Sequence, residues 1–266
     1  MGKYFDDIHA SKESQFNNTP CKIEDSPAIK ELKAKIRTEP DNYDAYLELG
    51  DLLNFQLRYR ESIDLYSKAI AINPLDVRGY RSRAPRYIAT LQFEKAYKDF
   101  AFCEEKSGIS LDTSYRIGLC LYFMKDYKAA EIRFISCIGL AENDFEMLAA
   151  INYWYIICRI KLGEVNISIP DLMPTHAQIS HHAGYQNAVE LFEGKLSIAA
   201  LIENTNRYIE PMNKPIALYG LFNYYIYKGL FEESRQLLES IINDDMYWIC
   251  FAYIGAWVDC MELNKK

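Results

Sequence analysis

A period of 34 residues runs through the middle of this chain of 266 residues. An aromatic residue returns at that interval, as Tyr59, Phe93 and Tyr127. After each aromatic residue, a small, a large and a second small residue follow at steps of 3, 4 and 3 positions. These columns are Ser62, Ala96 and Ala130, then Tyr66, Phe100 and Phe134, then Ala69, Cys103 and Cys137. Steps of three and four place side chains on one face of an α-helix, so each period predicts a helix with the same buried face.

The stretch before each aromatic residue repeats in the same register and predicts a second helix. One pair of its columns holds Leu49-Gly50, Arg83-Ala84 and Ile117-Gly118. A glycine inside a helix lowers helix propensity, but it lets another helix approach closely. Each period therefore predicts two helices joined by a tight turn just before the aromatic residue. One such hairpin cannot bury its apolar face alone, so we expect neighbouring hairpins to stack.

With this spacing, the chain resembles the tetratricopeptide repeat, a family of 34-residue helix–turn–helix units. Units 43–76, 77–110 and 111–144 match, and Pro74 closes the first unit where the family has its proline. The chain departs from the pattern at Arg83, which replaces a leucine, and the second and third units lack the closing proline. The resemblance implies an all-α fold, a right-handed superhelical solenoid of about five helix–turn–helix repeats.

We expect four regions along the chain, because the repeat register breaks after the third unit. They are a flexible N-terminal segment at 1–25; a capping helix plus three clear units at 26–144; degenerate helical repeats at 145–212, with an irregular insertion at 164–184; and, at 213–266, a C-terminal unit with a final apolar helix. Ser26 is the predicted N-cap of the capping helix, and Pro27 is its predicted first residue. Pro85 lies inside the first helix of the second unit and predicts a local bend there.

Charge and cysteine content exclude several classes of protein. The formal net charge is −7 and no block of Lys and Arg occurs, so we expect no binding to nucleic acid or to an anionic membrane. The longest apolar run without a charge, Met246–Val258, has thirteen residues, well short of the roughly 20 that span a bilayer. The N-terminus lacks the apolar stretch of a signal peptide. Seven cysteines without a CxxC pair favour reduced thiols and a cytoplasmic location.

In this family the first helices line a concave face, so the resemblance implies a binding groove there. Its predicted exposed columns are Asp44, Leu47, Asp51 and Asn54, then Arg78, Arg81 and Ile88, then Asp112, Tyr115, Leu119 and Tyr122, and later Tyr219, Asn223 and Tyr227. Tyr and Arg are among the residues that most often anchor partners. Arg78, Arg81 and Arg116 suit carboxylate binding by bidentate pairing, although local pairing with nearby aspartates is favoured. A solvated helix face without a specific partner is an equally weighted alternative for each residue.

Some members of the family grip a partner's C-terminal carboxylate with Lys and Asn side chains on these faces. The corresponding positions hold Leu47 and Asp51 in the first unit, and Arg78 and Ser82 in the second. The clamp pattern is therefore absent, which argues against an adaptor for chaperone tails.

No catalytic or metal-binding motif stands out. His176, His181 and His182 gather in one stretch, but adjacent histidines point apart on a regular element and HExxH is missing. A Gly-rich phosphate loop and GxSxG are missing as well. We therefore expect no metal, no cofactor and no catalysis.

The final helix carries the sequence MYWICFAYIGAWV, which has no charged residue. Such a helix is expected to be apolar on more than one side, whereas a terminal repeat normally has a polar outer face. Cover by another part of the chain is slightly favoured. The alternative is a surface that binds a partner or a second copy of the chain.

The favoured functional hypothesis is a non-catalytic scaffold for protein–protein interaction that holds a peptide or a partner helix in the concave groove. The first alternative is a regulator that senses a short peptide or a small ligand. The second alternative is an enzyme with a site between the 164–184 insertion and the groove, where His176, His181 and Tyr185 are the candidates. No motif supports the enzyme.

Overall fold

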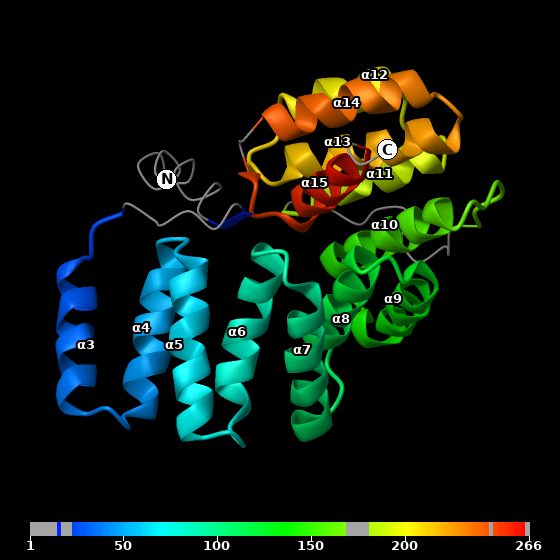
Figure 1. The fold of residues 1–266 in the computed structure, drawn as a ribbon. Coiled ribbons are helices and arrows are strands. Elements are labelled where there is room, and N and C mark those ends of the chain that lie inside the picture. The colour runs from blue at the N-terminus through cyan, green and yellow to red at the C-terminus, as the bar shows by residue number, and fades with distance from the viewer. Residues whose placement is uncertain (1–14, 17–22, 169–180, 245–246, 264–266) are drawn as a thin grey trace. The chain divides into compact units, whose positions relative to one another are not determined.

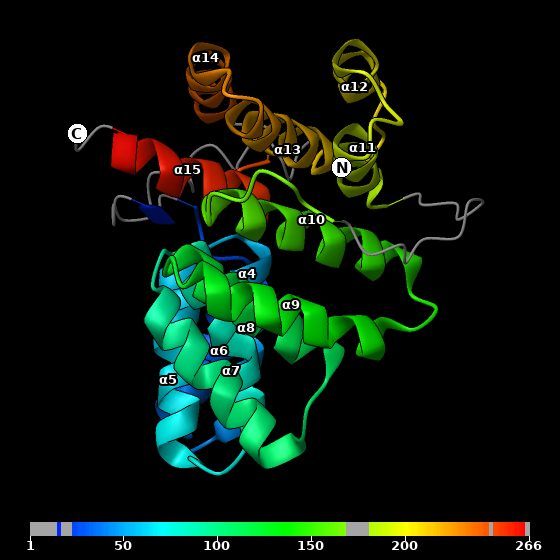
Figure 2. The same cartoon turned by 90° about the vertical axis from the view of Figure 1, so that its right-hand side faces the viewer.

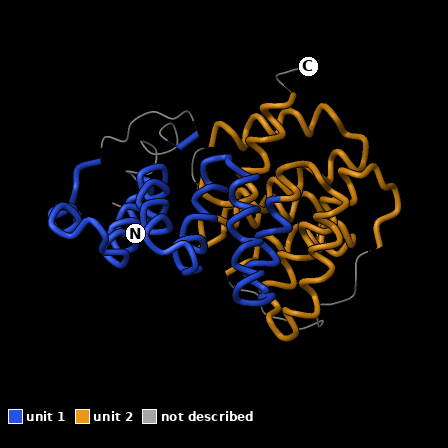
Figure 3. Tube along the Cα trace, turned by 60° about the horizontal axis from the view of Figure 1, so that its bottom comes forward, with its two compact units in different colours: residues 1–120 blue, residues 121–266 orange. Residues whose placement is uncertain are grey.

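The computed structural model describes residues 15–16, 23–168, 181–244 and 247–263. In these ranges the chain is built of 13 helices, α3 to α15, joined by turns and short connections. The predicted all-α fold is confirmed. The chain forms two compact units, residues 1–120 and 121–266 (Figure 3), and their boundary lies inside α8 (Leu111–Phe123). The four regions expected from the sequence stay a prediction.

Unit 1 is a row of helices in which each helix from α3 to α6 packs against the next. Its helices are α3 (Pro27–Thr38), α4 (Tyr43–Phe55), α5 (Tyr59–Ile72), α6 (Val77–Ala89), α7 (Phe93–Ser107) and the first part of α8. Contacts join α3 to α4, α4 to α5, α5 to α6 and α6 to α7 (Figure 1). The pairs α4–α5 and α6–α7 are the helix–turn–helix hairpins that the repeat predicts.

Helix α3 covers the apolar face that the first hairpin leaves open. The Ser26 side chain accepts a hydrogen bond from the Ile29 amide at 3.3 Å, and Pro27 begins the helix. Both predictions for this helix start are confirmed. Ile29 and Leu32 then join a cluster of buried residues with Leu49 and its neighbours on α4. A single helix is enough here because only one apolar helix face has to be removed from water.

The turn inside each hairpin uses a left-handed backbone conformation at a fixed position, two residues before the aromatic residue. The residues there are Leu57, Leu91 and Lys125, with φ of 57°, 60° and 68°. The following amide can then donate back to the first helix, as Arg58 N does to Leu53 O at 2.9 Å. Gly229, with φ of 73°, takes the same place before Phe231. For a residue with a β-carbon this conformation costs about 1–2 kcal/mol.

Gly50 explains why a small residue recurs in the middle of the first helix. A β-carbon at Gly50 would lie 2.5 Å from Cε1 of Tyr66 on α5. The ring of Tyr66 is fully buried. The glycine therefore lets α4 and α5 approach closely enough to bury an aromatic ring between them.

Arg83, where the chain departs from the repeat pattern, forms an ion pair with Asp99 on the next helix. Its guanidinium donates to both carboxylate oxygens of Asp99 at 2.8 Å and to Ser67 Oγ at 2.9 Å. The rings of Tyr80 and Tyr87 lie on the same guanidinium, with centroids at 5.5 and 5.2 Å. An ion pair thus fills a place in the α5–α6–α7 core that the preceding hairpin fills with leucines. Helix α6 continues through Pro85 to Ala89.

Unit 2 contains the remaining helices. They are α9 (Tyr127–Ala141), α10 (Phe145–Lys161), α11 (Ala183–Phe192), α12 (Ile198–Thr205), α13 (Asn213–Tyr227), α14 (Phe231–Asn243) and α15 (Phe251–Leu263). Helix α10 packs on α9 and α11, and α13 packs on α10, α11, α12, α14 and α15 (Figure 2). Helix α10 is buried along most of its length, which explains why its sequence is richer in aromatic residues than a repeat helix.

The final apolar helix is covered within its own unit. Helices α13 and α14 both pack against α15, and Trp248 and Tyr253 are fully buried. Intramolecular cover, the favoured interpretation, is therefore confirmed for these residues. None of the helices in the described ranges combines the length and the hydropathy of a membrane span.

Candidate functional site

One face of α4 and α6 brings together the exposed polar candidates of unit 1. Asp44, Leu47, Asp51 and Asn54 follow one another at steps of three and four, so they share a face of α4. The opposite face of α4 carries the buried residues of the core. Arg78 and Arg81 are exposed on α6, which contacts α4 directly. We call these six residues the α4/α6 face.

Arg78 ties the two helices together across this face. Its guanidinium lies 2.9 Å from Asp44 on α4 and 2.8 Å from Asp76 at the start of α6. The same group lies over the ring of Tyr43, 4.9 Å from its centroid. Hydrogen bonds from Arg78 lower the pKa of Asp76 below its ordinary value. The side chains of Arg78 and Asp44 are 57% and 77% exposed, so a ligand can reach both, and their pairing is the local kind that the sequence favours.

Arg81 lies on the same face but takes no part in this pairing. It is exposed and forms no ion pair within the described part of the chain. Deeper in the same face, the Tyr66 hydroxyl donates to Asp51 at 2.7 Å. Burial, and then Asp51, raise the pKa of Tyr66, so it remains a hydrogen-bond donor. The face therefore presents separate carboxylates and a free guanidinium along two adjacent helices.

Two further residues of α4 and α6 were not predicted from the sequence. Phe55 follows Asp51 by one helical turn and is 63% exposed. Arg86 on α6 lies beside Tyr66 and over the ring of Tyr59, at 5.6 Å, and its Nε has no hydrogen-bond partner in the described structure. The i+4 spacing from Asp51 is a signal for Phe55. Arg86 has no such signal, because its place depends on how α5 and α6 pack.

Several predicted groove residues are buried, and for them the expected exposure is wrong. They are Ile88, Tyr115, Leu119, Tyr122, Tyr219 and Asn223. Tyr122 shows the reason within unit 2. The indole of Trp154 on α10 lies over it, with ring centroids 4.9 Å apart. Helix α10 does not follow the repeat pattern, so its large side chains occupy space that a standard repeat leaves open.

Tyr122 and Tyr219 instead belong to a buried polar cluster in unit 2. Their hydroxyls lie 2.6 Å apart, and Tyr219 donates to Asp259 on α15 at 2.8 Å. Lys161 at the end of α10 donates to the same carboxylate at 2.7 Å. Burial raises the pKa of both tyrosines. This cluster ties α15 to α10 and α13, so its residues serve the core of the unit.

The remaining predicted residues are Asp112, Arg116 and Tyr227, and each has a hydrogen-bond partner within the chain. Arg116 pairs with Asp112 one turn earlier on α8, at 2.8 Å. Tyr227 is partly exposed and donates to the Val165 carbonyl at 2.9 Å. A role for any of these residues in binding stays a prediction.

The described residues offer little for metal or nucleophilic chemistry. No group of three His, Cys, Asp or Glu side chains in them is arranged to hold a metal ion. His176 lies outside the described residues, His182 Nδ1 lies 3.1 Å from the Glu146 carbonyl, and Tyr185 is buried. Burial raises the pKa of the Cys103 thiol to about 11, which leaves little thiolate at neutral pH.

Comparison with known proteins places parts of the chain among larger relatives. No family model matches the sequence. Over 163 residues the chain is 30% identical to the Hsp70-Hsp90 organizing protein of Triticum aestivum, a match that covers 60% of this chain and 27% of that protein. Over 117 residues it is 34% identical to the UDP-N-acetylglucosamine–peptide N-acetylglucosaminyltransferase of Giardia intestinalis, covering 44% of this chain and 7% of the transferase. The matched segments span less than a third of either relative.

One solved structure resembles the chain over most of its length. It is the crystal structure of YrrB, described as a TPR protein with an unusual peptide-binding site. The TM-score is 0.44 and the sequence identity 15%, over 90% of this chain and 100% of the YrrB chain.

Proposed function

Because the chain is a tetratricopeptide repeat protein, we propose that it is a non-catalytic scaffold that holds a peptide segment or a partner helix on the α4/α6 face. The observation that carries the proposal is Arg81, an exposed guanidinium without an ion pair beside the exposed Arg78–Asp44 pair. Arginine forms bidentate bonds with carboxylates and is enriched among residues that dominate binding energy.

The proposed contacts have both a charged and an apolar part. Arg81 pairs with a carboxylate of the partner, while Asp51 and Asp44 face its basic or amide groups. Phe55 and Leu47 supply apolar area on the same helix, and Phe55 in particular is 63% exposed. Mixed charges of this kind fix the register of a bound segment and set its on-rate more than its affinity.

A chaperone-tail adaptor is not part of the proposal, despite the similarity to Hsp70-Hsp90 organizing proteins. The carboxylate clamp of the family needs Lys and Asn where this chain has Leu47 and Asp51. A cytoplasmic location is part of the proposal, in keeping with the reduced thiols that the sequence predicts. The regulator and enzyme alternatives stay predictions, since no group in the described residues favours either.

Charge reversal of the α4/α6 face tests the proposal. We expect the full chain to capture a specific protein from its native lysate, and Arg78→Glu with Arg81→Glu to lower that capture at least tenfold. Reversal places two carboxylates opposite the partner's own, which is strongly unfavourable. Capture is quantified by mass spectrometry against the untagged matrix.

The matched control reverses two arginines elsewhere. Arg207 and Arg235 are exposed and each pairs with a glutamate one turn away, so Arg207→Glu with Arg235→Glu makes the same change in net charge. We expect this control to capture as the wild type does. Equal capture by the α4/α6 variant and the wild type, at equal melting temperature, would refute the proposal.

A further inference from the structure

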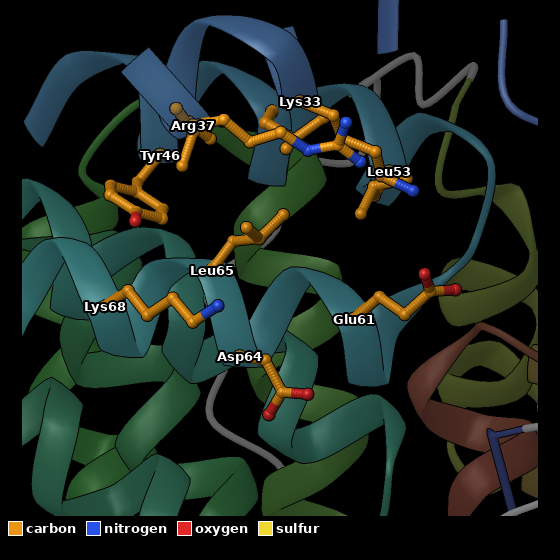
Figure 4. A pocket seen from close by; sticks show the side chains of 10 residues that line it. Lys33, Arg37, Tyr46, Leu53, Glu61, Asp64, Leu65 and Lys68 are labelled. Atoms are coloured by element: carbon orange, nitrogen blue, oxygen red, sulfur yellow. The ribbon is translucent and has the colours of Figure 1, made fainter. Parts of the chain in front are cut away.

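Unit 1 contains a pocket on the side of α4 that faces away from the α4/α6 face. It lies between α3, α4 and α5 and has a volume of ≈ 290 Å³. Its apolar lining, called the floor below, comes from Leu49 and Leu53 of α4, Ile36 of α3 and Leu65 of α5. Figure 4 shows Lys33 and Arg37 on one side of this floor and Lys68, Glu61 and Asp64 on the other.

The next groove along unit 1 is the counterpart of this pocket, and it is filled. A shift of 34 residues takes Leu49 to Arg83 and Leu65 to Asp99. Those two residues form the buried ion pair at 2.8 Å between α6 and α7. In the first groove, leucines stand at both places, so the apolar surface has no ion pair over it.

The rim of the two grooves differs in the same way. A shift of 34 residues takes Tyr46 to Tyr80 and Lys68 to Phe102. In the second groove Phe102 packs on Tyr80, with ring centroids 4.2 Å apart. In the first groove the Lys68 ammonium lies 5.9 Å from the Tyr46 centroid. The first groove thus has a cation at the position where the second groove has a phenylalanine ring packed on a tyrosine ring.

The charges around the pocket leave a net positive charge for a ligand. Lys33 is paired with Asp25, and Glu61 with Arg58, each at 2.6 Å. Of the other charged lining residues, Arg37 and Lys68 carry one positive charge each and Asp64 one negative charge, which leaves +1. Within the described part of the chain, neither cation forms an ion pair. A single carboxylate balances this charge, whereas a dianionic phosphate exceeds it.

We infer that this pocket is a second binding site, which takes an acidic–aliphatic peptide segment of a partner protein. One leucine-sized side chain lies on the apolar floor, and the neighbouring Asp or Glu pairs with Arg37 and Lys68. The volume lies just below the range of drug-sized ligand pockets, about 300–1,000 Å³, so it suits one side chain and its backbone. The inference goes beyond the proposed function, because it uses the opposite side of α4 and different residues.

The test is a titration of the full chain with short synthetic peptides, followed by NMR of leucine methyl groups. The probe is acetyl-Gly-Ser-Leu-Asp-Ser-Gly-amide, and its matched controls replace Leu with Ser or Asp with Asn. We expect saturable shifts of the Leu49 and Leu65 methyl signals with the probe. Both control peptides should bind at least tenfold more weakly, because each lacks one half of the recognised pair.

Three protein variants locate the binding. Arg37→Ala with Lys68→Ala removes both cations at the rim, and Leu65→Trp fills the cavity. Each variant should bind the probe at least tenfold more weakly than the wild type. Arg78→Glu with Arg81→Glu, on the other side of α4, should bind the probe as the wild type does. This last variant separates failure of the pocket from failure of the proposed function.

Several results would overturn the inference. Equal binding of the Ser-substituted peptide would show a plain anion site, and unchanged binding by the Arg37/Lys68 variant would place the peptide elsewhere. A dimeric mass of the free protein that this variant converts to a monomer would make the occupant a second copy of the chain. Absence of any methyl shift at millimolar probe would exclude the site altogether.

Discussion

At the scale of single residues, one buried ion pair replaces two leucines between α6 and α7. Arg83 and Asp99 are largely buried, with side chains 15% and 7% exposed. Burial raises the pKa of the Asp99 carboxyl even though Arg83 is hydrogen-bonded to it. Burial opposes the charge on Arg83 as well, but its hydrogen bonds to Asp99 and the charge of Asp99 raise the pKa of Arg83, so attraction outweighs the loss of water for the guanidinium and not for the carboxyl. Replacing such a pair by well-packed apolar residues is often neutral or stabilising, so we expect the intact pair to add little net stability.

Replacing one partner or both should have very different effects. Arg83→Leu alone leaves Asp99 buried without its cation, and we expect a loss of about 3 kcal/mol in unfolding free energy. Arg83→Leu with Asp99→Leu restores the residues of the preceding groove and should lie within about 1 kcal/mol of the wild type. Denaturant unfolding followed by circular dichroism measures both. A double variant that is less stable than the single one would contradict this account.

The left-handed turn residues give a second prediction at this scale. Lys125 has φ of 68° and pairs with Glu262, and both Lys125→Gly and Lys125→Ala remove that pair. We expect the glycine variant to be more stable by about 1 kcal/mol, because only glycine adopts this conformation without strain.

Lys128, inside α9, is the matched control for this prediction. There the order should reverse, with Lys128→Ala more stable than Lys128→Gly by up to about 1 kcal/mol, since glycine is a poor helix former. Melting temperatures of the four variants give the ranking. The same order at both positions would show that the turn residue is not strained.

At the scale of helices, the repeat register predicts where helices begin and which of their faces are buried. The steps of three and four placed the second helices and their buried columns, and Ser26 with Pro27 marked the start of α3. Gly50 signalled the close approach of another helix, and the structure shows that Tyr66 of α5 is the neighbour. The left-handed residue in each turn had no signal, because Leu57 and Lys125 are not residues that favour that conformation.

Helix α10 shows where pattern-based prediction ends. The repeat predicts that Tyr122 faces an open groove, but Trp154 of α10 packs over it. Tyr219 and Asn223 came from a stretch whose register could not be carried across the insertion, and both are buried. Which residues of unit 2 face solvent depends on large side chains from neighbouring helices, and one repeat column does not contain that information.

At the scale of the whole chain, the candidate surfaces described here both lie in unit 1. The α4/α6 face and the α3–α5 pocket use opposite sides of α4. The sequence predicted the polar columns of the first surface, since Asp44, Leu47, Asp51 and Asn54 share a helix face. It did not predict the pocket. Leu65 and Asp99 occupy the same repeat position, but only the structure shows that Asp99 pairs with Arg83 in the second groove while Leu65 lines a pocket in the first.

The central claim is that a partner contacts the α4/α6 face, and site-specific photo-crosslinking tests it most directly. A photo-reactive phenylalanine analogue is placed at Leu47, and as a control at Ile202 on α12, which is 45% exposed. The full chain is then irradiated in native lysate. We predict a crosslinked partner from position 47 that disappears when Arg78→Glu and Arg81→Glu are added, and none from position 202. Crosslinks from 202 to the captured partner, with none from 47, would contradict the claim.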